Sequence, residues 1–68
     1  MSTVGIYLKI KESREMKRHT VEYVAIQMEM TVQLYLKVET GDVDLKISKL
    51  DKLAKVLGIK KSELFAFN

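Results

Sequence analysis

Apolar residues recur at helical spacing on both sides of a polar break in the middle of the chain. They are Val21, Val24, Ala25 and Met28 before the break, and Met30, Leu34, Tyr35 and Val38 after it. Side chains three or four positions apart share one face of an α-helix. The pattern therefore predicts two short helices, over residues 21–28 and 32–40, joined by a tight turn.

The residues at the ends of these two segments support the prediction. Thr20 and Thr31 precede the helices, and a threonine hydroxyl at that place accepts a hydrogen bond from an otherwise unpaired amide. Gly41 follows the second helix, where glycine adopts a left-handed cap without steric cost. Two helices of this length cannot cover each other's apolar faces, so the flanking segments are expected to complete the core.

A further helix is expected ahead of this pair, from residue 4 or 5 to about residue 18. Ile6 and Ile10 lie one turn apart on its inward face. Ser13 falls where that face requires another large apolar side chain. We expect Met16 or the stem of Arg14 to fill the space, because both side chains are long and adaptable.

The last third of the chain predicts a fourth helix and a short closing element. Asp44 is placed to cap the fourth helix, and Gly58 is placed to end it. The apolar positions of this helix have helical spacing, at Ile47, Leu50, Leu53, Ala54 and Leu57. The closing element begins at Ile59, with Leu64 and Phe65 expected to complete the core.

With 68 residues, the chain is expected to form one all-α domain over residues 1–68. The predicted architecture is a compact five-helix bundle with a helix-turn-helix at about residues 20–40. A chain this short buries a modest fraction of its surface, so a homodimer is an expected route to stability.

The charge is unevenly distributed along the chain. The net charge is +3, with +3 on residues 1–19, −4 on residues 20–44 and +4 on residues 45–68. A net positive charge favours a polyanionic partner, yet the predicted pair of helices is the acidic part of the chain. The basic residues that end the first helix are expected to be either solvated or in contact with phosphate, and most lysines of the fourth helix are expected to be solvated.

Composition argues against catalysis and metal binding. The chain has no cysteine and a single histidine, His19, and it has neither a nucleophile–histidine arrangement nor a glycine-rich phosphate loop. We therefore expect a protein that is not an enzyme and that uses no metal or cofactor. No apolar run is long enough to span a bilayer and no secretion signal is recognisable, so a cytoplasmic location is expected.

Taken in order, these residues resemble the Cro/repressor-type (Xre-like, lambda-repressor-like) helix-turn-helix family. The resemblance covers nearly the whole chain, and its specificity lies in the ordered combination rather than in any single motif. It is carried by residues 10–12, Arg14-Glu15, Thr20, Val24-Ala25, Thr31, Val38-Glu39, Gly41, residues 53–59 and residues 63–65. It implies a five-helix DNA-binding domain that acts as a transcriptional repressor.

The resemblance also implies which residues contact DNA. In this family the third helix lies in the major groove, and the start of the second helix contacts phosphate. By position, the DNA-binding residues are Lys17, Thr20, Thr31, Val32, Gln33, Leu36 and Lys37. Gln33 is suited to adenine and Lys37 to guanine or a phosphate oxygen. The implied partner is duplex DNA, bound by a homodimer.

Several positions depart from the family pattern. Val21 replaces a glutamine that usually braces the backbone contact. Glu29 replaces the usual glycine of the turn, so we expect it to adopt a left-handed conformation at a cost of roughly 1 kcal/mol. Asp42 and Asp44 stand where basic residues are usual, and phosphate would repel them.

A second interpretation stays open from the sequence alone. Val32 and Leu36 lie one turn apart on the outward face of the third helix, and an exposed apolar patch is typical of a protein-binding surface. The fold would then serve protein–protein interaction or oligomerisation, with weak or no DNA binding. Alternatively, these side chains pack against the fourth helix.

Overall fold

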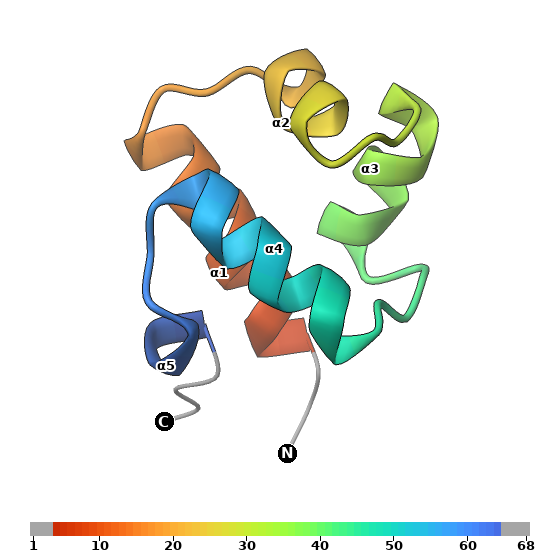
Figure 1. The fold of residues 1–68 in the computed structure, drawn as a ribbon. Helices are drawn as coiled ribbons and strands as arrows, with labels where there is room; N and C mark the ends of the chain where they lie inside the picture. Colours follow the sequence, from red (N-terminus) through yellow and green to blue (C-terminus); the bar gives the residue numbers. More distant parts are fainter. Residues whose placement is uncertain (1–3, 65–68) are drawn as a thin grey trace.

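A computed structural model of the protein describes residues 4–64 and the side chains of residues 5–64. The chain forms five α-helices in the order α1 (Val4–Met16), α2 (Val21–Gln27), α3 (Val32–Thr40), α4 (Ile47–Leu57) and α5 (Lys61–Leu64). The predicted all-α, five-helix architecture is confirmed (Figure 1). No helix within this part of the chain combines the length and the apolar character needed to cross a membrane.

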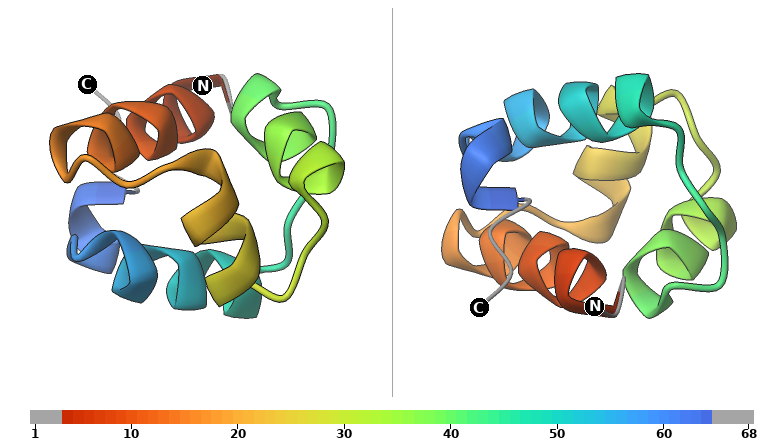
Figure 2. Two further views of the ribbon diagram at one scale, coloured as in Figure 1. Left: turned by 90° about the horizontal axis from the view of Figure 1, so that it is seen from above. Right: turned by 90° about the horizontal axis from the view of Figure 1, so that it is seen from below.

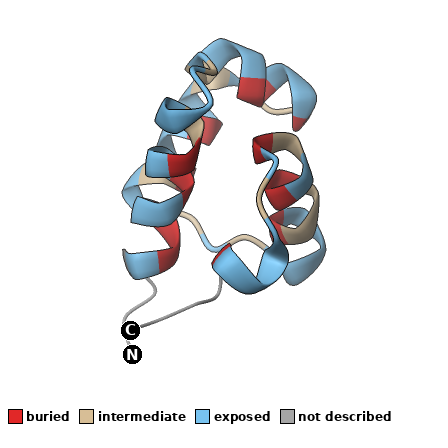
Figure 3. Ribbon diagram, turned by 90° about the vertical axis from the view of Figure 1, so that its left-hand side faces the viewer, coloured by how far each residue is buried: buried red, intermediate tan, exposed pale blue. Residues whose placement is uncertain are grey.

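The helices surround one core. Helix α1 packs against α3, α4 and α5, and α2 packs against α3 and α4. Figure 2 shows α1 and α4 on opposite sides of the molecule, with α2 and α3 joining them. The buried positions face the interior (Figure 3), and the largest fully buried side chains are Tyr35, Ile10, Met28, Leu53, Leu57, Leu64, Val24 and Val38.

Most helix ends lie where the sequence predicts them. The amide of Tyr23 donates to the Thr20 hydroxyl at 3.0 Å, and the amide of Leu34 donates to the Thr31 hydroxyl at 3.1 Å. Gly41 and Gly58 end α3 and α4 with φ of +80° and +71°. Glycine tolerates this left-handed conformation because it has no Cβ. Both threonine caps and both glycine ends are therefore confirmed.

The end of α1 and the start of α4 differ from the prediction. Helix α1 ends at Met16 rather than at about residue 18, and Arg18 has a φ of 58°, outside the helical range. Lys46, not Asp44, is the N-cap residue of α4, and no side chain caps this helix. Ile47, expected in the core, is 70% exposed, because it is the first residue of α4 and the buried side of the helix begins at Leu50. The predicted contact of Phe65 lies outside the described residues.

The space beside Ser13 is not filled as expected. Ser13 is buried, whereas Met16 is 83% exposed. Arg14 turns away from this space toward α3. The expectation that Met16 or Arg14 would fill the gap is therefore wrong, and a hollow remains between α1 and the turn that joins α4 to α5.

An ion pair joins α1 to α3. Nε of Arg14 donates to Oε2 of Glu39 at 2.6 Å, and Nη2 donates to Oε1 at 3.2 Å. Both side chains are largely buried, with 13% and 6% exposed. Arg14 also donates from Nη1 to the carbonyl oxygen of His19 at 3.1 Å. One guanidinium group therefore connects α1, the C-terminal half of α3 and the segment that leads into α2.

Breaking this pair is predicted to destabilise the protein. Glu39→Ala should lower the free energy of unfolding by about 2–3 kcal/mol, because it leaves a largely buried guanidinium without its partner. Arg14→Met combined with Glu39→Leu should recover most of that loss, since no unpaired charge remains. Urea denaturation measures both changes. As a matched control, Lys55→Ala removes the exposed pair with Asp51 and should cost about 0.5 kcal/mol or less. Equal costs for Glu39→Ala and Lys55→Ala would contradict the prediction.

Glu29 lies in the turn between α2 and α3 with a φ of 58°, as predicted. Glu29→Gly should therefore stabilise the protein by about 1 kcal/mol, because glycine adopts this conformation without the Cβ penalty. The hydrogen-bonded Lys52 at 3.1 Å lowers the pKa of Glu29. The stabilising contribution of this pair is present above the ordinary pKa of a glutamate and is lost as the pH falls through the lowered value. The advantage of Glu29→Gly should consequently grow in acid.

Urea midpoints at neutral and acidic pH check this prediction. Glu12→Gly is the matched control, because Glu12 is exposed within α1 and glycine inside a helix destabilises by about 1 kcal/mol. Destabilisation by Glu29→Gly at both pH values would count against the strain argument.

Candidate nucleic-acid interface

Helix α3 has one buried side and one open side. Tyr35 and Val38 are fully buried against α1 and α2, whereas Gln33, Leu36 and Lys37 are exposed. This division follows from the sequence, because positions 35 and 38 share a helix face that positions 33, 36 and 37 do not. The predicted outward position of Leu36 is therefore confirmed. Val32, predicted on the same outward face, is instead half-buried against the core.

The structure brings five of the predicted DNA-binding residues together on this helix. Thr31 caps its start and is exposed, and Val32 is half-buried against the core. Gln33 and Lys37 lie one turn apart on the open side, with Leu36, 44% exposed, beside them. The group combines an amide, a cation and two apolar side chains, which are the types that contact base edges.

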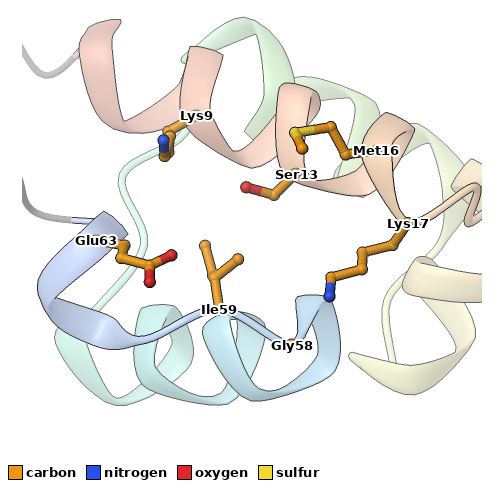
Figure 4. Close-up of a pocket in the computed structure, with 7 residues that line it drawn as sticks. All are labelled: Lys9, Ser13, Met16, Lys17, Gly58, Ile59 and Glu63. Carbon is orange, nitrogen blue, oxygen red and sulfur yellow. The ribbon is translucent and has the colours of Figure 1, made fainter.

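Thr20 and Lys17 lie apart from the α3 group. Thr20 is exposed at the start of α2, where its hydroxyl oxygen already accepts a hydrogen bond from the amide of Tyr23. Lys17 extends toward Gly58 at the C-terminal end of α4 (Figure 4), and its Nζ lies 3.6 Å from the position that a Cβ would take on Gly58. In the conformation described, its ammonium therefore lies beside α4 rather than α3.

The charge around α3 is mixed. Lys37 is the one basic residue of α3, and the exposed Arg18 precedes α2. Arg14, by contrast, is held internally by Glu39 and is neither solvated nor placed to meet a phosphate. Asp42 is exposed after the helix and accepts the hydroxyl of Thr40 at 3.1 Å. The candidate interface is therefore not strongly basic.

Sequence reasoning missed the polar group that supports α3 from inside. Glu39 was expected only as part of the family resemblance, but its carboxylate raises the pKa of Arg14 through their hydrogen bonds. The hydroxyl of Tyr35 is buried beside this pair without a well-aligned hydrogen bond among the described residues. Burial, and then the Glu39 carboxylate, raise the pKa of Tyr35 far above its ordinary value. The phenol therefore stays neutral and anchors α3 by packing.

A second contact absent from the sequence analysis lies at the start of α2. The rings of His19 and Tyr23 stack with their centroids 4.7 Å apart and their planes 28° apart. Their spacing of four residues across a helix start was the available signal. The stack fixes the segment between α1 and α2 from its exposed side.

Comparison with known proteins adds a family to this geometry. A family model described as helix-turn-helix matches residues 10–64. The match includes α2, α3 and the turn between them. No curated protein and no solved structure matched the chain. Because the family match spans most of the sequence, the chain belongs to the Cro/repressor-type helix-turn-helix family of DNA-binding domains.

Proposed function

We propose that the protein is a transcriptional repressor that binds duplex DNA with α3 in the major groove. The observation that carries the proposal is the open side of α3, where Gln33 and Lys37 are exposed on a helix whose opposite side is fully buried. A helix presented in this way can enter the major groove, whose width admits one α-helix. The repressor role is inferred from the family. Repression would follow because the bound domain blocks polymerase.

Each α3 residue has a role that follows from its chemistry. Gln33 forms two hydrogen bonds with adenine, and Lys37 contacts guanine or a phosphate oxygen. Val32 and Leu36 contact the methyl group of thymine. Thr31 contributes its hydroxyl at the start of the helix.

Thr20 and Lys17 contact the phosphate backbone of the DNA. The Thr20 hydroxyl accepts one hydrogen bond within the protein and still has a proton to donate to a phosphate oxygen. Lys17 reaches phosphate after its flexible side chain leaves Gly58, which is a small rearrangement for an exposed lysine.

The number of cations that contact phosphate limits the affinity of one subunit for DNA. In this proposal Lys17, Arg18 and Lys37 are the cations that contact phosphate. Each phosphate neutralised contributes about 0.9 to the slope of log K against log salt, so one subunit should give a slope of about −3. Such a subunit binds weakly, which favours a homodimer on two half-sites about one helical turn apart.

Replacing Gln33 tests base recognition. Gln33→Ala should weaken specific binding by about 1–3 kcal/mol and relax the preference at one base pair, because a bidentate contact is lost. Binding curves on the preferred duplex and on its single-base variants measure both effects. Gln27→Ala is the control, since Gln27 is an exposed glutamine at the end of α2 and should leave the preference unchanged. An equal loss on specific and random DNA would exclude base reading by Gln33.

A second candidate function is protein binding through α3. Leu34 and Leu36 are 40% and 44% exposed, and the exposed Asp42 follows the same helix. An apolar surface with acidic neighbours fits a protein partner better than a polyanion. The candidate partners are a second copy of the chain or another protein.

Leu36→Glu separates the two functions when self-association and DNA binding are measured on the same sample. Under the DNA-binding proposal, the variant should keep the oligomeric state of the parent and lose DNA affinity or change its sequence preference. Loss of self-association with unchanged DNA affinity per subunit and unchanged sequence preference would favour the protein interface. Ile47→Glu is the control, because Ile47 is an exposed apolar residue of α4 outside the proposed interface.

A further inference from the structure

The hollow between α1 and the turn joining α4 to α5 has the composition of a small-molecule site. It is lined by Lys9, Ser13, Met16, Lys17, Gly58, Ile59 and Glu63 (Figure 4). Its volume of about 360 Å³ lies at the lower end of the range found for ligand pockets. The hollow lies on a different part of the protein from the open side of α3.

The hydroxyl of Ser13 points into this hollow (Figure 4). Ser13 is only 5% exposed, and its side chain is directed into the space between α1 and Ile59 (Figure 4). It takes part in none of the side-chain hydrogen bonds formed within residues 4–64. Since no hydrogen bond within this part of the chain uses its proton, the hydroxyl can donate to a ligand in the hollow.

The charged and apolar groups around Ser13 define the kind of ligand. Lys9 and Lys17 contribute two positive charges and Glu63 one negative charge, so the lining carries a net charge of +1. Neither lysine forms an ion pair with Glu63 among the described residues. Met16 and Ile59 supply apolar surface between the charged groups. This arrangement favours an anionic group joined to an apolar body.

We propose that this hollow binds a small amphipathic monocarboxylate. The carboxylate accepts hydrogen bonds from the Ser13 hydroxyl and from a lysine ammonium, and charge-assisted hydrogen bonds of this kind are the stronger ones. The apolar body packs against Met16 and Ile59. The ligand would also contact Lys17, directly before the segment that leads into α2, and the site therefore adjoins the helix-turn-helix. Lys17 also belongs to the proposed DNA contact, but the two proposals can be tested separately, because ligand binding is measured without DNA.

The test is a titration of the full-length, ¹⁵N-labelled protein with octanoate, followed by amide chemical shifts. The amides of Ser13, Met16, Gly58 and Ile59 should shift and saturate with a dissociation constant on the order of 1 mM or tighter. Octan-1-ol supplies the apolar body without the negative charge, and inorganic phosphate supplies negative charge without the apolar body. Each should bind at least about threefold more weakly than octanoate. Equal binding by either of them would overturn the proposal of an amphipathic anion.

Two variants locate the site. Ser13→Leu fills the hollow with apolar atoms, so it should abolish the octanoate shifts while raising the melting temperature. Lys9→Gln removes one charge of the lining without altering the core and should weaken binding about three- to fivefold. Lys11→Gln, a matched change on the outer side of α1, should have no effect. Undiminished binding by Ser13→Leu, or equal effects of the Lys9 and Lys11 variants, would overturn the proposal.

Discussion

The ion pair between Arg14 and Glu39 is the contact on which the position of α3 depends. It is bidentate and largely buried, and the same guanidinium also holds the carbonyl oxygen of His19 before α2. One side chain of α1 therefore holds both α3 and the segment that leads into α2. Apolar packing by Tyr35 and Val38 then secures the inner side of α3. The outer side is left open because no helix of the described chain covers it.

Local features of the fold were predictable from the sequence because they depend on neighbouring residues. The range of α3, both threonine caps and both left-handed glycines follow from spacing and from the conformational preferences of single residues. The left-handed Glu29 was predictable from the family resemblance instead, because it stands where the family usually has the glycine of the turn. The division of α3 into a buried side and an open side followed from its periodicity.

Features that depend on distant residues were not predictable. Arg14 and Glu39 are 25 positions apart, and nothing in helical spacing indicates that they meet. Ile47 fits the apolar pattern of α4 but is its first residue, before the buried side of the helix begins at Leu50. The hollow beside Ser13 arises because Arg14 turns toward α3 and Met16 toward solvent. The direction of the Lys17 side chain likewise depends on the position of Gly58, a contact between separate helices.

The central claim is that the open side of α3 reads a sequence in duplex DNA. Selection of random duplexes on the purified protein, followed by a salt titration of the winning duplex, tests it most directly. The account predicts one enriched sequence that binds at least about 10³-fold more tightly than random DNA, with a salt slope of about −3 for each bound subunit. Failure to enrich any sequence, or equal affinity for the winning and random duplexes, would contradict it.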